Sequence, residues 1–595
     1  MNKIRNFAII AHVDHGKSTL ADRFLELTDI LSSDHQDQFL DRNPVSRERG
    51  ITIKLAPVRM RYSLTGLNQK SENNYILNLI DTPGHVDFSY EVDRTLACVE
   101  GVILLIDASQ GVQAQTIANV YKAVEKNLVI IPVINKIDLP NADIEKTKKQ
   151  LVDFLGIKEE EIFLISAKTG EGVEKLLKAV IEKIPSPSKI LLKSNKGDFS
   201  LFLKTHFCGL IFDSYYDNHR GVIIFIRVFQ GIIKKGDKVR LVNLKTKFEV
   251  NEVGYFNPDL RSSEKLDHGE IGYVVTNLRD IHQVAVGDSL VLETDKDFSL
   301  PGYQKIKPMV FASIFPTDSD DYLNLKSALE KLALNDSSLE FQGVYSQALG
   351  SGFRVGFLGL LHADVVRERL EREFGLSLVL TPPRVEYLDS DKKGFKKEPW
   401  VKITILSPEN YLGEIMQLMI NYRAVFLSMD NKNQLILSYQ MPMAEMITDF
   451  FDRLKSVSSG YASLDWEMIG YQEVRADQLK ILINGQEIEE FSEIVVEEKS
   501  YQRGSLLISR LKELIPRQQF EVKIQASYRG KIIASTKITP YRKNVLVKSG
   551  KVLGTGDVGR KKKLLERQKE GKKRMKMIGK VEVPKEAFLK MYGRN

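Results

Sequence analysis

The sequence predicts a multidomain protein that combines α/β and α+β units. Its 595 residues suffice for about four domains at roughly 150 residues each. The N-terminal part alternates apolar strands with helical segments, which predicts a parallel sheet flanked by helices. Short alternating strands follow and are typical of a β-barrel, and later segments mix strands with amphipathic helices. A distinct C-terminal domain with a basic tail is expected to end the chain.

Composition limits the class of protein. Hydrophobic residues make up 43% and charged residues 28%, which is ordinary for a soluble globular chain. No apolar run approaches the ~18 residues that a membrane span requires, and His12 and Asp14 interrupt the first apolar stretch too early for a signal peptide. The two cysteines, Cys98 and Cys208, match no metal spacing, so we expect packing roles in a reducing, cytoplasmic compartment.

A phosphate-binding loop is predicted near the N-terminus. The strand IRNFAII at 4–10 leads into AHVDHGKS and then into the helical pattern TLADRFLEL. Backbone N–H groups of such a loop and of the following helix bind phosphate oxygens, Lys17 adds a positive charge for the β- and γ-phosphates, and the Ser18 hydroxyl can ligate Mg²⁺. Ala11 stands where this motif has its first glycine. The predicted contacts of the loop are Asp14, His15, Gly16, Lys17, Ser18 and Thr19.

A second strand, YILNLI at 75–80, ends in Asp81-Thr82-Pro83-Gly84-His85. A carboxylate at such a strand end can hold Mg²⁺ through water, so Asp81 is a candidate metal residue. The N–H of Gly84 can meet a γ-phosphate, and the missing Cβ lets the loop move.

Two further strands predict the identity of the base. LVIIPVI at 128–134 ends in Asn135-Lys136-Ile137-Asp138, and EIFLIS at 161–166 leads into Ser166-Ala167-Lys168. The Asp138 carboxylate can accept hydrogen bonds from guanine N1–H and N2–H₂, which adenine does not offer, and sites built on such bonds discriminate by ~10⁴-fold or more. The backbone of Ser166, Ala167 and Lys168 can reach guanine O6. Each motif alone is weak, but all four in this order, each after an apolar strand, predict a GTP site with Mg²⁺.

At this point the sequence resembles the translational GTPases. AHVDHGKS, DTPGH, NKID and the segment Arg47-Glu48-Arg49-Gly50-Ile51-Thr52 match that family's set. The resemblance implies that Thr52 closes over Mg²⁺ and the γ-phosphate in the GTP state. It implies that His85 orients the attacking water once the ribosome docks, and that Val13 and Ile51 flank that histidine as a hydrophobic gate. Phosphoryl transfer depends on positioning and charge stabilisation, which fits these roles.

The remaining segments narrow the resemblance to one family of translational GTPases. Residues 1–185 would be the GTP-binding P-loop domain, 200–292 a translation-factor β-barrel, and 305–385 and 400–482 two ferredoxin-like α+β sandwiches similar to the third and fifth domains of elongation factor G. LGSGFRVGFLGLLHADVVRERLEREF, ELIPRQQF and LLERQKEGKKRMK resemble the elongation factor 4 (LepA) family, whose C-terminal domain would occupy 486–595.

Three segments depart from that family's pattern. They are Asn43-Pro44-Val45-Ser46 before the switch segment, Glu497-Glu498-Lys499, and the loop KSGKVLGTGD at 548–557. None touches the predicted nucleotide site, and the last two bear on tRNA contact by the C-terminal domain.

The net charge of +8 is concentrated at the C-terminal end. Residues 560–580 hold 11 Lys and Arg against two acids, a balance of +9, so the rest of the chain is near −1. Such a run can neutralise phosphates without reading sequence, which favours RNA binding over a merely solvated face. Anionic lipid is the second choice, because the segment has no broad apolar face. The predicted RNA contacts are Arg560, Lys561, Lys562, Lys563, Lys572, Lys573, Arg574 and Lys576.

The resemblance therefore implies a ribosome-dependent, GTP-hydrolysing factor that uses GTP/GDP and Mg²⁺, and that acts on ribosomes and their tRNAs, including reverse movement of tRNA. We expect a cytoplasmic monomer with rRNA and ribosomal proteins as partners, and a weak peripheral association with the inner membrane face. Two alternatives remain open: another translational GTPase of similar length, such as a BipA-like or tetracycline-protection factor, and a binding module with a vestigial GTPase site.

Overall fold

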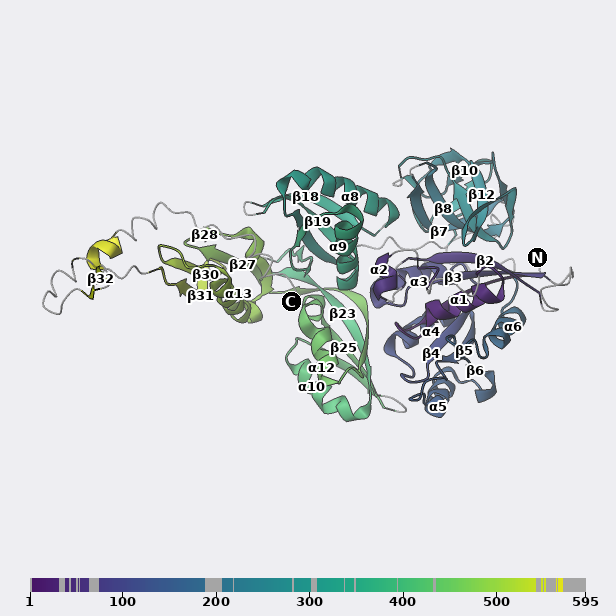
Figure 1. Cartoon of the computed structure of the whole chain (residues 1–595), viewed down its shortest axis with the longest axis horizontal. Coiled ribbons are helices and arrows are strands. Elements are labelled where there is room, and N and C mark those ends of the chain that lie inside the picture. Colours follow the sequence, from purple (N-terminus) through teal and green to yellow (C-terminus); the bar gives the residue numbers. More distant parts are fainter. Residues whose placement is uncertain are drawn as a thin grey trace.

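The protein is an elongated string of sheets and helices (Figure 1). The computed structural model describes residues 3–31, 38–41, 44–49, 52, 54–63, 74–187, 206–217, 219–280, 283–300, 308–336, 338–346, 349–392, 394–431, 435–541, 547–548, 551–552, 563 and 565–570. The N-terminal unit and the barrel lie at one end, two α+β sandwiches lie in the middle, and the C-terminal unit lies at the other end. This is the multidomain α/β and α+β class that the sequence predicts.

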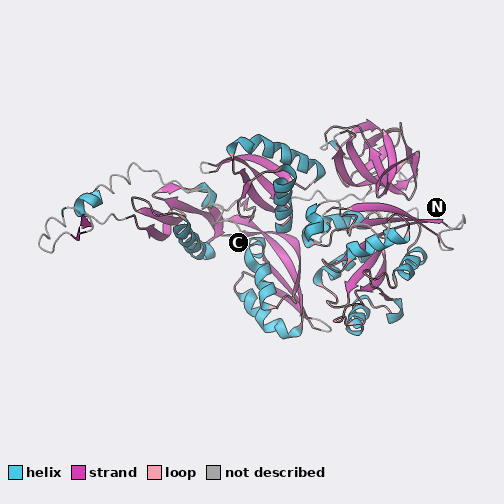
Figure 2. Cartoon of the chain, in the orientation of Figure 1, coloured by secondary structure: helices cyan, strands magenta, loops and turns pink. Residues whose placement is uncertain are grey.

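The N-terminal unit is a sheet in the order β2-β3-β1-β4-β5-β6, parallel except for the β2–β3 pair. All seven residues of β4 are buried, because helices cover both faces of the sheet (Figure 2). The strands are β1 Ile4–Ala11, β2 Ala56–Ser63, β3 Asn74–Asp81, β4 Gly101–Asp107, β5 Val129–Asn135 and β6 Phe163–Leu164. The helices are α1 Lys17–Leu27, α2 Pro44–Arg49, α3 Ser89–Leu96, α4 Ala114–Glu125, α5 Ile144–Leu155 and α6 Val173–Lys183, with 3₁₀ turns η1 Val86–Phe88 and η2 Glu159–Glu161.

The barrel consists of an eight-stranded antiparallel sheet in the order β11-β10-β16-β7-β8-β15-β12-β13 and the two-stranded pair β14-β9. Its strands are β7 Cys208–Asp217, β8 Gly221–Gln230, β9 Ile232–Lys234, β10 Lys238–Leu241, β11 Lys247–Glu249, β12 Glu252–Asn257, β13 Asp259–Ser263, β14 Lys265–Asp267, β15 Ile271–Val275 and β16 Ser289–Leu292.

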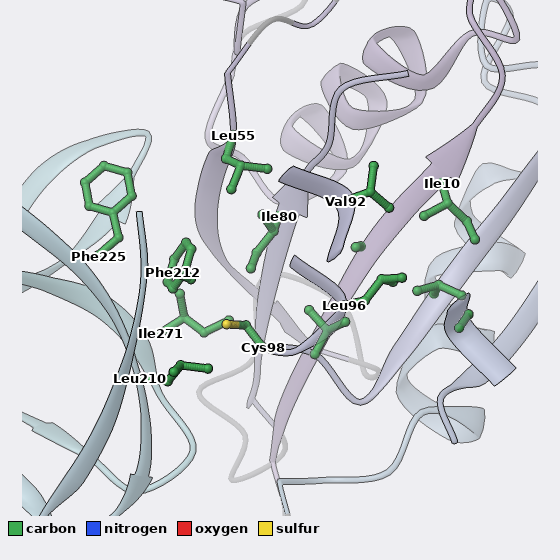
Figure 3. Close-up of a cluster of buried hydrophobic side chains, with 14 of the residues drawn as sticks. Ile10, Leu55, Ile80, Val92, Leu96, Cys98, Leu210, Phe212, Phe225 and Ile271 are labelled. Carbon is green, nitrogen blue, oxygen red and sulfur yellow. The ribbon is translucent and has the colours of Figure 1, made fainter. Parts of the chain in front are cut away.

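The barrel and the N-terminal unit share a hydrophobic cluster (Figure 3). In this view Cys98 lies beside Ile271 and Leu210 of the barrel, and Leu96 lies beyond Cys98. Cys98 and Cys208 are both free, buried thiols of this cluster, as the sequence predicts, and burial raises the pKa of Cys208 to about 12. Ion pairs join the same two units: Arg227 to Glu100 and Arg59 to Glu270, each at 2.6 Å.

Two sandwiches follow, each a sheet covered by helices on one face. The first contains β17 Val310–Pro316, η4 Ser319–Asp321, α8 Tyr322–Asn335, β18 Glu340–Ser346, β19 Gly350–Phe357, α9 Leu360–Phe374, β20 Leu378–Leu380 and β21 Arg384–Val385. The second contains β22 Leu388–Asp389, β23 Lys396–Ser407, η5 Glu409–Tyr411, α10 Leu412–Ile420, β24 Val425–Asp430, β25 Leu435–Pro442, α11 Met443–Glu445, a π-helical turn Met446–Phe450, α12 Phe451–Val457 and β26 Ser463–Val474.

The C-terminal unit packs one long helix, α13, on a sheet in the order β28-β27-β30-β31, with β29 paired to β27. Its elements are β27 Ala476–Ile483, β28 Gln486–Glu487, η7 Glu489–Phe491, β29 Glu493–Val496, η8 Glu497–Lys499, α13 Ser500–Leu514, β30 Val522–Tyr528 and β31 Lys531–Ile538, followed by the pair β32 Val547–Lys548 and β33 Lys551–Val552. Within the described ranges, no helix is long and apolar enough to cross a membrane.

Candidate nucleotide site

The candidate site lies at one edge of the N-terminal sheet, where β1, β3 and β5 end. Ile9 of β1 pairs with Asp81 of β3, and Asp107 of β4 pairs with Asn135 of β5. Because β1, β3, β4 and β5 run parallel, the loops that follow them gather at one edge. The four predicted motifs are therefore brought together by the strand order alone.

The loop after β1 takes backbone conformations suited to its sequence. Gly16 has φ 91°, and a Cβ there would lie 2.4 Å from Asn135 Nδ2. Asp14 also has a positive φ, 65°, which aspartate tolerates better than most residues. α1 begins at Lys17, so its first N–H groups face the loop, as phosphate binding requires.

Four polar side chains predicted from three separate motifs form one hydrogen-bonded cluster. Lys17 Nζ donates to Thr52 Oγ1 at 2.6 Å and pairs with Asp81 Oδ1 at 2.8 Å. Ser18 Oγ lies 3.3 Å from Thr52 Oγ1, and Thr52 donates to Asp81 Oδ2 at 3.3 Å. Ser18, Thr52 and Asp81 are the predicted metal residues, and the structure places them side by side.

Asp41, which was not predicted from the sequence, joins this cluster. Ser18 Oγ donates to Asp41 Oδ2 at 3.2 Å, and Thr52 Oγ1 lies 3.4 Å from the same oxygen. Burial and then the charge of Asp81 raise the pKa of Asp41. Two hydroxyls and two crowded carboxylates are a hard, oxygen-only donor set, which fits Mg²⁺. An acid eleven residues before Thr52, just ahead of the segment that departs from the family pattern, was the available signal.

Asn135 holds the site's loops together. Its Nδ2 donates to His15 O at 2.9 Å, and its Oδ1 accepts from Ala167 N at 2.9 Å. Both ends of this amide thus serve the protein, so it connects the phosphate loop to the predicted guanine loop.

Lys136 also connects separate loops of the site, through its ammonium group. Its Nζ donates to Asp14 O at 2.6 Å and pairs with Asp107 Oδ2 at 2.8 Å. Asp107 was also missed, although it ends the apolar strand β4 as Asp81 ends β3. Arg23 of α1 was the third residue missed, and it donates to Ala167 O at 2.9 Å and to Lys168 O at 2.8 Å.

The predicted base-reading residues lie beyond these connections. Asp138 is exposed, so its carboxylate is available to a base. Ser166 is fully buried, and its Oγ accepts from Thr169 N at 3.1 Å, which shapes the turn that presents Ala167 and the exposed Lys168.

Three histidines lie near the phosphate loop. Burial lowers the pKa of His15 to about 3, so its ring is neutral near pH 7. His12 Nδ1 bonds Gln115 Oε1 at 2.8 Å; burial lowers its pKa first, with a smaller contribution from the charge of His85. His85 Nδ1 accepts from Asp87 N at 3.1 Å, and its side chain is 31% exposed.

The remaining predicted residues of the site are Gly84, Val13, Thr19 and Ile51. Gly84 is buried, and a Cβ there would meet the backbone of Ala11 and Val13 at 3.6 Å, which is ordinary contact. Val13 is partly buried and Thr19 is exposed, whereas Ile51 lies outside the described residues.

Most of the predicted RNA contacts also lie outside the described residues. Among them only Lys563 is described, in a short helix that continues over residues 565–570, and it is exposed. The structure thus leaves the role of the tail a prediction.

Models of known protein families match four stretches of the chain. The model of the elongation factor Tu GTP binding domain matches residues 2–186, and that of elongation factor Tu domain 2 matches residues 221–291. The elongation factor G C-terminus matches residues 396–482, and the GTP-binding protein LepA C-terminus matches residues 483–593. The last match decides against the BipA-like and tetracycline-protection alternatives.

Curated relatives agree along the full length. The chain is 46% identical over 610 residues to elongation factor 4 of Shouchella clausii, with 99% of this chain and 97% of the relative covered. It is 48% identical to elongation factor 4 of Mycoplasma capricolum and of Streptococcus pneumoniae, with 99% of this chain and 98% and 97% of those relatives covered. A solved structure from Thermus thermophilus shares the fold at 15% identity, with a TM-score of 0.57 over 79% of this chain and 97% of that chain.

Proposed function

Because the chain belongs to the elongation factor 4 family, we propose that it hydrolyses GTP on the ribosome and acts on the ribosome's tRNAs. The observation that carries this proposal is the cluster of Lys17, Ser18, Thr52 and Asp81, with His85 on the loop after Asp81. Phosphoryl transfer requires positioned charges and a placed nucleophile, and these residues supply both.

Each predicted residue takes one part of the task. Lys17 would move from Asp81 onto the β- and γ-phosphates. Ser18 and Thr52 would hold Mg²⁺ directly and Asp81 would hold it through water. Asp41 would lie beside them. A bound Mg²⁺ neutralises charge on the phosphates. Thr52 lies in the switch segment, so its contacts would order that segment with GTP and release it after hydrolysis.

His85 would place the attacking water. Its Nδ1 accepts a hydrogen bond from Asp87 N, so Nε2 is the nitrogen left to orient a water, and the loop would have to bring it beside the γ-phosphate. Contact with the ribosome would drive this movement, with Val13 and Ile51 as the flanking apolar residues. The ribosome would then activate GTP hydrolysis by placing His85, and no strong base would be needed.

Action on tRNA, including reverse movement, is assigned to the C-terminal unit. The match of residues 483–593 to the LepA C-terminus supports this assignment. The segment Glu497–Lys499, which departs from the family pattern, forms η8. It is bonded to another part of the chain, because Lys499 Nζ pairs with Glu445 Oε2 at 2.7 Å. Lys499 therefore links the C-terminal unit to the second sandwich.

The basic tail would bind rRNA through its lysines and arginines. Weak association with the inner membrane face is the less favoured role of the same residues, and monomeric behaviour is expected.

The test is the rate of GTP hydrolysis with and without purified ribosomes, with ATP as the control nucleotide. We expect strong stimulation for GTP and none for ATP. GTP binding without turnover under any condition would instead support a binding module with a vestigial site. A rate of GTP hydrolysis that ribosomes leave unchanged would mean that the ribosome is not the activating partner.

A further inference from the structure

A cavity of about 340 Å³ lies between the N-terminal unit and the barrel. Three arginines line it, namely Arg59, Arg61 and Arg261, and Asp29 is the only acid among the lining residues. This volume is near the lower end of small-ligand pockets, so the cavity has room for a group about the size of one nucleotide. None of these residues belongs to the candidate nucleotide site.

The sheet geometry brings the arginines together. Arg59 and Arg61 are two residues apart on β2 and therefore project from the same face. Arg261 of β13 is the cross-strand partner of Tyr255 on β12, and β12 packs against β2. Residues from two units thus converge on one cavity.

Arg59 is held rigidly at the cavity's wall. Its Nη2 donates to Glu270 Oε1 at 2.6 Å, and its guanidinium lies 4.5 Å from the centroid of the Tyr255 ring. The side chain is only 8% exposed, and its Nε has no hydrogen-bond partner in the described structure. A buried donor without a partner needs an explanation, because nearly all such groups are satisfied in folded proteins.

Arg61 and Arg261 leave more donors unused. Both are exposed, and within the described ranges neither guanidinium group forms a hydrogen bond or ion pair. The carbonyls at the end of α1, which borders the cavity, are already occupied: Thr28 Oγ1 donates to Phe24 O at 2.8 Å, and Ile30 N donates to Leu25 O at 2.9 Å. The unsatisfied hydrogen-bonding capacity of the cavity is therefore mainly that of guanidinium donors.

We propose that this cavity binds a phosphate group, carried either by a free phosphate compound or by an RNA backbone. Guanidinium groups match phosphate oxygens with paired, charge-assisted hydrogen bonds. Arg59 forms the fixed wall, Arg61 and Arg261 close on the anion from the two units, and the Asn257 amide supplies a further donor beside them. An occupant bridges the N-terminal unit and the barrel, so the site senses how these two units are arranged.

The test uses the full chain with saturating GDP and Mg²⁺, which keeps other phosphates out of the nucleotide site. Binding of inorganic pyrophosphate and of a labelled oligouridylate RNA is measured by calorimetry and by anisotropy at several salt concentrations. The variant is R61Q/R261Q, which leaves the buried Arg59 and its ion pair intact. The matched control is Arg279→Gln, an exposed arginine of the barrel that does not line the cavity.

If the occupant is a free phosphate compound, R61Q/R261Q lowers pyrophosphate affinity by at least about tenfold, and R279Q does not. If it is an RNA backbone, pyrophosphate binding is absent or unchanged, while the salt slope of RNA binding falls by roughly 1.4, at about 0.7 per neutralised phosphate of a single strand. Both results support the site. The proposal is overturned if wild type and R61Q/R261Q bind both probes with equal affinity. It is also overturned if R279Q loses as much affinity for a probe as R61Q/R261Q does.

Discussion

Gly16 is constrained twice, by its backbone and by its neighbour. Its φ of 91° is a left-handed conformation, and its missing Cβ leaves space for Asn135 Nδ2, which bonds the next-door carbonyl of His15. The phosphate loop and the guanine loop thus meet at one glycine. The need for a glycine here could be predicted from the motif, whereas its contact with Asn135 could not, because that contact is made across 119 residues of chain.

Gly16→Ala tests this contact. We expect the variant to lose measurable binding of GTP and GDP, because the added methyl group displaces the Asn135 amide. Nucleotide affinity is measured by calorimetry, and folding by thermal denaturation.

Gly156→Ala is the matched control, since Gly156 has φ 67° but a Cβ there would meet nothing within 4 Å. It should cost about 1 kcal/mol of stability and leave nucleotide binding intact. Equal nucleotide affinity in the two variants would contradict the account.

Among the elements, one side chain connects the loop after β3, which carries His85, to the first sandwich. Asp87 in η1 accepts from Leu361 N at 2.9 Å, at the first turn of α9, while its own N–H donates to His85 Nδ1. Gly359, just before α9, has no side chain that could cap the helix, and a Cβ there would lie 2.2 Å from Asp87 Cγ. A carboxylate from another unit thus takes the place of the helix cap.

Asp87→Ala should expose the start of α9. Loss of a cap costs about 1 kcal/mol, so amide exchange in the first turn of α9 should rise about fivefold. Hydrogen exchange followed by mass spectrometry measures this directly. Asp87→Asn keeps an acceptor oxygen and should retain most of the protection, and unchanged exchange in Asp87→Ala would show that the contact has no capping effect.

The elements show where prediction from sequence succeeds and where it stops. Alternating apolar strands and glycine loops predicted the parallel sheet and its site edge, because periodicity and local turns are encoded in short segments. Arg23 was missed because it acts on residues of another segment and no local pattern marks it. Asp41 also acts on another segment, and its one signal in the sequence is its position eleven residues before Thr52. The predicted domain limits stay predictions.

At the scale of the whole molecule, three units meet around Glu91 of α3. It is buried, Asp213 of the barrel and Asp336 of the first sandwich add negative charge, and Arg94 and Lys54 add positive charge. Burial, followed by the charge of Asp213, raises the pKa of Glu91 to about 8. Burial opposes ionisation of Asp336 too, but the charge and hydrogen bond of His362 lower its pKa overall.

The raised pKa of Glu91 sets the direction of a pH effect. Between its ordinary value of 4.5 and about 8 the folded state binds the proton more tightly, so stability falls as pH rises through this window. We expect the thermal midpoint of the full chain to fall from pH 5 to pH 8, and Glu91→Gln to flatten that fall. Exposed Glu125→Gln is the control, and a profile identical in both variants would contradict this account.

The basic tail is the second whole-molecule feature. Deleting the residues after Gly559 removes the +9 segment, so ribosome binding should weaken and its salt dependence should flatten. Affinity for ribosomes at several salt concentrations measures both effects. Binding that the deletion leaves unchanged at every salt concentration would refute an RNA-binding tail.

If the ribosome activates the site by placing His85, single-turnover GTP hydrolysis by His85→Ala on ribosomes is the measurement that shows it. We expect unchanged GTP affinity and a hydrolysis rate lower by about 10²–10⁴-fold, with partial recovery in His85→Gln, whose amide can still orient water. A His85→Ala variant that hydrolyses GTP on ribosomes as fast as the wild type would contradict it.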